Sequence, residues 1–428
     1  MSNLSKTREK INKIDKKMAE LFEERMNLSK EVASYKTVNH LPIEDFNREH
    51  EVLEKSSSYI KKDELKGYHK KFQENLMSIS KDYQKELLNK QSNDRRITVS
   101  SIEPYEIVIK RDALYEVEKY LNLNRKVLII TDENVPANYS KIVSVKCKEP
   151  YIHTIKSGDF YKNILNYELI QQFLIENNFT RGDAIIAVGG GVVGDLAGFI
   201  ASTYMRGIDF YNIPTTLLSM VDSSIGGKTA INYMNYKNIV GSFYDPKMVI
   251  IDPNVLKTLN ERQINSGLAE SIKMALTFDK NLYELIKNSS NLDSNIEDII
   301  YKSLLIKKRV VEEDRLESNL RRVLNFGHTI GHAIESLSGG KLLHGECVSL
   351  GMIYFVSPSL KDELKTTLQK YNLPTSISFD KEEIMKFISH DKKASNDSIK
   401  TIWVEEIGAY IIKELMFSEI EELLWVTH

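Results

Sequence analysis

Residues 184–195 read Ala-Ile-Ile-Ala-Val-Gly-Gly-Gly-Val-Val-Gly-Asp, a short apolar run that opens directly into a glycine-rich turn. An apolar run of this length is typical of a strand buried on both faces of a parallel sheet. The turn contains Gly-x-Gly-x-x-Gly ahead of a helical pattern, which lets the backbone approach a diphosphate closely. The alternative is a tight turn of an ordinary α/β domain, but a second Gly-Gly-Lys at 226–228 favours the nucleotide site.

The surrounding chain falls into three zones of different texture. Apolar runs at 127–130 and 249–251 alternate with helical segments, so we expect an α/β domain over residues 97–255. Residues 256–428 return to helical periodicity, with one short strand expected at 401–404. Residues 1–90 contain a single Gly and a single Pro, and apolar residues recur every three, four and seven positions, which predicts an all-helical domain. The polar stretch 89–96 is the expected linker.

Composition excludes several classes of protein. Lys and Arg number 58 against 60 Asp and Glu, a net charge of −2, so the chain lacks the basic excess of a nucleic-acid binder. No apolar run approaches the ~20 residues that span a bilayer, and the polar start shows no signal peptide. With only Cys147 and Cys347, a disulfide framework is excluded, and we expect a soluble protein of the reducing cytoplasm.

Three histidines and a carboxylate form a candidate metal site. His328 and His332 stand at i and i+4 on one helix face, His344 follows, and Glu270 lies on another predicted helix. Two imidazoles, a carboxylate and an open position suit a catalytic zinc ion. The spacing does not decide between such a site and ordinary core or surface histidines. It also leaves open whether His332 is a ligand or a neighbouring acid or base.

The helical zone carries charged residues on its apolar stripe. Arg25 follows Met18 by seven positions, and Lys36, eleven residues further on, shares the same face. Buried cations need anionic partners, although such side chains can also reach the solvent or pair with nearby Glu. Further polar residues gather at the next helix start and on the third helix: Asp45, Arg48, Glu49, Ser80 and Gln84.

Beyond residue 97 the chain resembles 3-dehydroquinate synthase. The strings that carry the resemblance are 189–199, 214–218, 221–228, 237–238 and 325–332. The resemblance implies a Rossmann-like NAD-binding α/β domain followed by a mostly α-helical metal-binding domain. It also implies the conversion of 3-deoxy-D-arabino-heptulosonate 7-phosphate to 3-dehydroquinate and phosphate, with NAD taking up and returning a hydride and with Zn²⁺ or Co²⁺ bound.

The same resemblance assigns residues to three sets. The metal ligands are Glu270, His328 and His344, and His332 becomes a phosphate-side or proton-transfer residue. The substrate pocket comprises Arg206, Lys228, Lys237, Asn238, Lys273, Lys307, Arg321 and Asn325, with Lys392 and Lys393 reaching the same pocket. The NAD site comprises Asp132, Asn134, Asp159, Lys162, Gly190, Gly191, Val192, Asp195, Thr215, Thr216, Asp222 and Thr258.

Three positions depart from the pattern of that family. Asp159 stands where Glu is usual, so its reach toward a ribose hydroxyl is altered. Asn319 replaces a usual Gly, and we expect it to tolerate the left-handed conformation. Tyr236 stands where Gly is commoner.

Residues 4 to about 88 resemble the all-helical chorismate mutases. Matching positions include Arg8, Arg25, Lys36, Glu49 and Gln84. The resemblance implies rearrangement of chorismate to prephenate in an intertwined dimer, with Arg8 reaching into the partner's site. Arg8, Arg25 and Arg48 would clamp the carboxylates, Lys36 and Gln84 would bond the ether oxygen, and Glu49 the ring hydroxyl. Asp45 and Ser80 would complete the pocket.

Together these resemblances predict a bifunctional enzyme of aromatic biosynthesis, acting on small molecules as a homodimer or higher homo-oligomer. One alternative keeps the synthase but makes the helical domain a sensing or dimerising module without catalysis. Another is a metal- and NAD-dependent polyol dehydrogenase, against which the Lys- and Arg-rich pocket speaks. No nucleic-acid or membrane partner is expected.

Overall fold

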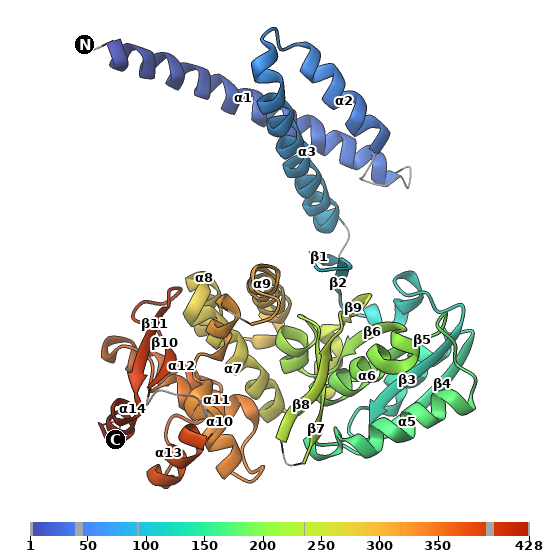
Figure 1. Ribbon diagram of the computed structural model, residues 1–428, viewed down its shortest axis with the longest axis vertical. Helices are drawn as coiled ribbons and strands as arrows, with labels where there is room; N and C mark the ends of the chain where they lie inside the picture. Colours follow the sequence, from blue (N-terminus) through green and yellow to red (C-terminus); the bar gives the residue numbers. More distant parts are fainter. Residues whose placement is uncertain are drawn as a thin grey trace. The chain divides into compact units, whose positions relative to one another are not determined.

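The computed structural model describes residues 3–38, 46–91, 94–234, 236–317, 319–390 and 398–426. The chain divides into two compact units, Met1–Arg95 and Arg96–His428 (Figure 1). The linker expected over 89–96 is shorter than predicted, because one helix runs to Gln91 and the first strand begins at Arg95.

The described part of the first unit consists of α1 (Asn3–Val38), α2 (Phe46–Ser58) and α3 (Asp63–Gln91). Both α1 and α2 pack against α3. The apolar stripe predicted on α1 forms, but three helices leave much of it uncovered. Its exposed fractions run from 41% to 63% for Ile11, Ile14, Met18, Leu21 and Phe22. The described helices of the single chain therefore do not cover this stripe.

The second unit contains a seven-stranded sheet in the order β1-β2-β9-β6-β5-β3-β4. Its strands are β1 (Arg95–Val99), β2 (Tyr105–Ile109), β3 (Lys126–Asp132), β4 (Glu149–Ile155), β5 (Ala184–Gly189), β6 (Asp209–Pro214) and β9 (Met248–Ile251). The pairs from β2 to β4 across the sheet are parallel. Every residue of β5 is buried, which explains its wholly apolar sequence. All three strands predicted in this zone are present.

Helices and short turns flank the sheet. They are η1 (Ala113–Lys119), α4 (Ala137–Ser144), η2 (Asp159–Tyr161), α5 (Ile164–Glu176), α6 (Gly191–Thr203) and η3 (Tyr204–Arg206). Helix α6 begins directly after β5, so the glycine turn lies at the carboxyl edge of the sheet. A hairpin of β7 (Lys228–Tyr233) and β8 (Tyr236–Phe243) packs on α6.

The rest of the second unit is mostly helical and forms a lobe beside the sheet (Figure 1). Its long helices are α7 (Glu261–Phe278), α8 (Lys280–Asn288), α9 (Leu292–Glu313), α10 (His328–Leu337), α11 (His344–Met352), α12 (Pro358–Lys370), α13 (Lys381–His390) and α14 (Phe417–Val426). Shorter helical turns are η4 (Ser219–Ser223), η5 (Pro253–Thr258) and η6 (Leu320–Asn325). None of the described helices is long and apolar enough to cross a membrane.

The strand predicted at 401–404 belongs to a hairpin. β10 (Ser398–Trp403) pairs antiparallel with β11 (Ile411–Met416), which the sequence analysis did not anticipate. Lys413 and Glu414 interrupt the apolar run of β11, and most of the strand is exposed. The alternation that marks a half-buried strand is therefore weak there.

A close helix contact gives a first prediction. Gly345 lies in the first turn of α11, where an added Cβ would overlap the backbone carbonyl oxygen of Ser266 on α7. Gly345→Ala should therefore lower the free energy of unfolding of the second unit by about 3 kcal/mol. Gly182→Ala is the control, because the nearest atom to its Cβ is 3.7 Å away. Equal denaturant midpoints for the two variants would contradict this contact.

Candidate functional site

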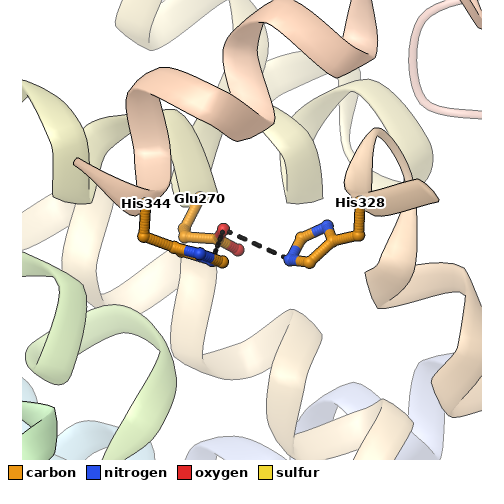
Figure 2. A group of neighbouring side chains, drawn as sticks. All are labelled: Glu270, His328 and His344. Atoms are coloured by element: carbon orange, nitrogen blue, oxygen red, sulfur yellow. Dashed lines mark ion pairs between the residues drawn. The ribbon is translucent and has the colours of Figure 1, made fainter. Parts of the chain in front are cut away.

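Three helices bring the predicted metal ligands together. Glu270 lies within α7, while His328 and His344 are the first residues of α10 and α11. Figure 2 shows both imidazoles directed at the Glu270 carboxylate. Oε1 of Glu270 is 3.4 Å from Nε2 of His344 and 3.7 Å from Nε2 of His328. Ligand atoms around a tetrahedral zinc ion lie roughly 3.3 Å apart, so the cluster is close to that geometry.

The chemistry of these donors also suits a divalent cation. The Glu270 carboxylate is fully buried; its Oε2 forms an ion pair with Lys273, and its Oε1 has no hydrogen-bond partner among the described residues. Burial alone would raise the pKa of Glu270. The adjacent Lys273 cation and the neighbouring histidines lower this pKa by more, so that it lies well below its usual range. Burial also lowers the pKa of His328 well below its usual value, which favours the neutral imidazole that binds metals. Burial lowers the pKa of His344 too, but the carboxylates of Glu270 and Glu335 raise it to about 10 overall, so a metal ion would have to displace a proton from its Nε2. The group therefore fits the expected Zn²⁺ or Co²⁺.

Each histidine is oriented through its other ring nitrogen. Nδ1 of His328 lies 3.0 Å from the carbonyl oxygen of Phe326. Nδ1 of His344 lies 2.8 Å from Oε2 of Glu335. When Nδ1–H donates to these oxygens, Nε2 keeps its lone pair and faces Glu270. Glu335 was not singled out from the sequence, since it matches no motif and only the fold brings it to His344.

His332 stands beside the cluster. Its ring centroid is 5.0 Å from that of His328 and 5.9 Å from that of His344. Its ligand atom groups with those of Glu335 and His344, whereas Glu270 groups with His328 and His344. Both groups of three could hold a metal ion and they share His344; Glu270 of the first group is buried, whereas His332 of the second is exposed.

Ion pairs and hydrogen bonds hold several of the residues that were predicted for the substrate pocket. Buried Lys307 donates to Asp222 Oδ1 at 2.5 Å, and burial lowers the pKa of Lys307 to about 8. Lys228 pairs with Glu317, whose Oε1 also accepts from Asn325 Nδ2 at 2.9 Å. Glu317 therefore contacts two of the residues predicted for the substrate pocket, although it was not itself among the predicted residues.

The remaining cations differ in their surroundings. The Arg321 guanidinium is buried and donates to the backbone oxygens of Gly226 and Arg315. Arg206 ends η3 with a φ of 69°, and among the described residues it makes no hydrogen bond or ion pair with the other pocket groups. In the loop before η6, the left-handed residue is Glu317 at φ 61°, whereas Asn319 has φ −140°. Asn319 therefore does not need the left-handed conformation that we expected it to tolerate.

The predicted nucleotide residues lie around the carboxyl edge of the sheet. Gly190, Gly191 and Val192 form the start of α6, and an added Cβ on Gly190 would lie 3.1 Å from Thr216 Cγ2. The Thr215 amide donates to the Gly189 oxygen at 2.9 Å, which holds the ends of β5 and β6 together. Parallel strands end at a common edge, where dinucleotides bind in such sheets.

Other members of this set form separate local contacts. Lys162 Nζ donates to Asp195 at 2.7 Å and to Asn238 Oδ1 at 2.6 Å, which joins a nucleotide residue to a substrate residue. The backbone N–H of Asn134 donates to Asp132 Oδ1 at 2.8 Å, and Thr258 Oγ1 lies 3.0 Å from Tyr139 Oη.

The departure at Asp159 has a structural consequence. Its Oδ2 accepts from Asn232 Nδ2 at 3.0 Å and lies 3.4 Å from Lys237 Nζ. Lys237 in turn donates to Glu335 Oε1 at 2.8 Å. The short carboxylate of Asp159 is therefore engaged with the β7–β8 hairpin.

In the first unit, the side chain of Arg25 has a buried donor atom. Its Nη1 is buried without a hydrogen-bond partner among the described residues, and burial lowers its pKa. Below it, Ser29 Oγ lies 2.7 Å from Ser80 Oγ, which joins α1 to α3. A buried guanidinium donor without an acceptor suits an anionic ligand.

The structure gives less detail for the other predicted residues of the helical pocket and for two of the substrate pocket. Arg8 is exposed on α1, and Arg48 pairs with Glu51 at 3.0 Å. Asp45, Lys392 and Lys393 lie outside the described residues. The side chains of Lys36, Glu49 and Gln84 also lie outside the described part of the structure.

The fold and the cluster together define an α/β enzyme with a metal centre beside a dinucleotide-type turn. Family models for 3-dehydroquinate synthase match residues 152–266 (N-terminal) and 267–394 (C-terminal). The model for chorismate mutase type II matches residues 7–85. The chain belongs to the 3-dehydroquinate synthase family and carries a chorismate mutase type II domain.

Individual relatives agree with this assignment. The chain is 43% identical over 344 residues to a 3-dehydroquinate synthase of Lactococcus lactis subsp. cremoris, covering 75% of this chain and 97% of that protein. It is 42% identical over 343 residues to one of Streptococcus thermophilus, with the same coverage. Among solved structures, 2-deoxy-scyllo-inosose synthase complexed with carbaglucose-6-phosphate, NAD⁺ and Co²⁺ has a TM-score of 0.71 at 26% identity, covering 77% of this chain and 99% of that one.

Proposed function

We propose that the chain is a bifunctional enzyme. Its second unit converts 3-deoxy-D-arabino-heptulosonate 7-phosphate to 3-dehydroquinate and phosphate, and its first unit rearranges chorismate to prephenate. The observation that carries the synthase is the Glu270, His328 and His344 cluster beside buried lysines in a member of the synthase family. The observation that carries the mutase is the buried Nη1 of Arg25, which has no hydrogen-bond partner among the described residues of a chorismate mutase type II domain.

The metal-dependent site is proposed as follows. Glu270, His328 and His344 would hold Zn²⁺ or Co²⁺, and the metal would polarise a substrate oxygen while NAD accepts and returns a hydride. Lys273 and Lys307 are buried cations that would hold negative charge on the substrate at fixed positions. Lys228 and Asn325, which converge on Glu317, would bind the phosphate. His332 would move a proton or contact that phosphate.

Other residues would bind the rest of the substrate and the dinucleotide. The fork-shaped guanidiniums of Arg321 and Arg206 suit a carboxylate or a phosphate, and Lys237 and Asn238 would close the pocket from β8. The NAD set would be Asp132, Asn134, Asp159, Lys162, Gly190, Gly191, Val192, Asp195, Thr215, Thr216, Asp222 and Thr258. On this assignment residues 97–255 bind NAD, residues 256–428 hold the metal and most of the substrate pocket, and residues 1–90 form the mutase.

In the mutase, catalysis needs only fixed charges. Arg25, Arg8 and Arg48 would hold the two carboxylates of chorismate, and Lys36 and Gln84 would stabilise charge on the ether oxygen as the bond breaks. Glu49 would bond the ring hydroxyl, and Asp45 and Ser80 would complete the pocket. Ser80 is buried against Ser29, and this contact between α1 and α3 would close one side of the proposed pocket.

A metal-chelation experiment tests the bifunctional assignment. Purified protein, stripped with a chelator, should lose phosphate release from heptulosonate phosphate while keeping its rate of chorismate consumption. Adding Zn²⁺ or Co²⁺ should restore the synthase, because only that site uses a metal. Protein that consumes no chorismate before or after chelation would leave the helical domain as a sensor or dimerisation module.

We further propose a homo-oligomer, with the α1 stripe as its contact. The exposed apolar residues of α1 form a continuous stripe at helical spacing, which a second copy could cover. Molar mass in solution should be at least twice that of one chain, and Leu21→Lys should lower it; an unchanged mass would exclude this surface.

We place the protein in the cytoplasm because Cys147 and Cys347 are both free thiols.

A further inference from the structure

Glu335 links the metal cluster to the substrate pocket. It lies near the end of α10, and its side chain is 21% exposed. Oε2 is 2.8 Å from Nδ1 of His344, and Oε1 accepts from Lys237 Nζ at 2.8 Å. The two oxygens of one carboxylate therefore serve two different partners, on α11 and on β8.

The contact to His344 determines how that imidazole is presented. A carboxylate accepts but cannot donate, so the proton shared with Glu335 lies on Nδ1, and Nε2 is the nitrogen left to bind a metal. Nε2 then faces Oε1 of Glu270 at 3.4 Å. His328 is held by a neutral backbone carbonyl, that of Phe326. Of the two histidines, His344 is the one with a charged outer partner among the described residues, and a charged partner makes the imidazole a stronger ligand.

The contact to Lys237 reaches in the opposite direction. The Lys237 side chain is 58% exposed, and its second partner is Asp159 at 3.4 Å. A chain of contacts thus runs from Asp159 through Lys237 and Glu335 to His344. Lys237 lies on the β7–β8 hairpin, which also carries Lys228 and Asn238. The position of this hairpin is therefore tied to a metal ligand.

We propose that Glu335 is a positioning residue that sets the affinity of the metal site through His344 and holds Lys237 ready for an anionic group of the substrate. The inference rests on the proposed metal site and adds a residue that acts on it from outside. It predicts that one substitution changes both metal retention and the KM for substrate.

The test compares three variants of the full chain by metal titration. Glu335→Gln keeps an oxygen that accepts from Nδ1–H but loses the charge, and Glu335→Leu loses both. Glu363→Gln is the matched control, because Glu363 pairs with Lys287 at 2.6 Å on α12 and α8, away from any histidine. Each metal-free protein is titrated with Zn²⁺ and with Co²⁺ against a chromophoric chelator.

We expect Glu335→Gln to weaken metal binding by about 10- to 100-fold, as outer partners of metal-bound histidines usually do. Glu335→Leu should weaken it further, and Glu363→Gln should match the wild type. At saturating metal, Glu335→Gln should raise KM for heptulosonate phosphate more than it lowers kcat, because Lys237 loses its partner.

The outcomes separate this inference from the function on which it rests. Wild-type metal affinity in both Glu335 variants would overturn the positioning role while leaving the metal site intact. A wild-type protein that binds neither Zn²⁺ nor Co²⁺ would instead overturn the proposed metal-dependent function. If the leucine variant does not fold, the nearly isosteric Gln variant decides, with its melting temperature in the metal-free form as the check on folding.

Discussion

His328→Ala and His344→Ala should each abolish phosphate release and leave the purified protein largely free of metal. Each substitution leaves only two of the three ligands proposed, too few to hold a catalytic zinc ion tightly. The loss of affinity should exceed the roughly 10- to 100-fold that follows the loss of an outer partner. Metal content by elemental analysis and the rate of phosphate release are the two measurements.

The control for this prediction is His153→Ala. His153 lies on β4 with its ring centroid 5.9 Å from that of Phe173, away from the cluster. That variant should keep its metal and its synthase activity. Chorismate consumption should survive in all three variants, because the mutase needs no metal. Normal metal content and phosphate release in both His328→Ala and His344→Ala would refute the assignment of the ligands.

The strands, the glycine turn and the pairing of His328 with His332 could be predicted because their signals are local. The apolar run of β5 passes directly into the glycine turn, and both features lie within twelve residues of sequence. His328 and His332 share a helix face at i and i+4, so their proximity follows from helix geometry. The approach of Glu270 and His344 depends on tertiary packing, and for these two the resemblance supplied what spacing could not.

Contacts between distant elements explain most of what was missed. Glu335 and Glu317 carry no motif, and each acquires its role only when the fold places His344, Lys237, Lys228 or Asn325 beside it. The apolar stripe of α1 is a feature that the sequence does identify, but without showing what covers it. Helical periodicity identifies the apolar face, but it does not reveal whether the same chain or another covers that face.

Arg25→Ala should lower kcat/KM for chorismate by about 100- to 1000-fold, or about 3–4 kcal/mol of transition-state stabilisation. A carboxylate of the substrate would lose its guanidinium partner, the donor Nη1 that is buried in the structure. Arg25→Lys should recover only part of the rate, since an ammonium group cannot reproduce the planar pair of donors. Synthase activity should stay near the wild-type value, because the two sites belong to different units of the chain.

Lys16→Ala provides a matched control on the same helix. Lys16 is a surface cation of α1, 80% exposed and paired with Glu20. Its removal should change neither prephenate formation nor thermal stability measurably, as expected for an exposed ion pair. A loss of mutase activity in Lys16→Ala as large as that in Arg25→Ala would show that general charge on α1, and not a specific contact, supports the reaction.

Stability distinguishes a ligand-binding arginine from a structural one. In the ligand-free protein, Nη1 of Arg25 is buried without an acceptor among the described residues, and such a group costs free energy. Replacing it with Ala removes that cost, so the melting temperature of the helical unit should stay the same or rise while catalysis falls. Opposite changes in activity and stability are typical of residues kept for function. A large drop in melting temperature, with no chorismate consumption even in the wild type, would assign Arg25 to the fold and the helical domain to a role other than catalysis.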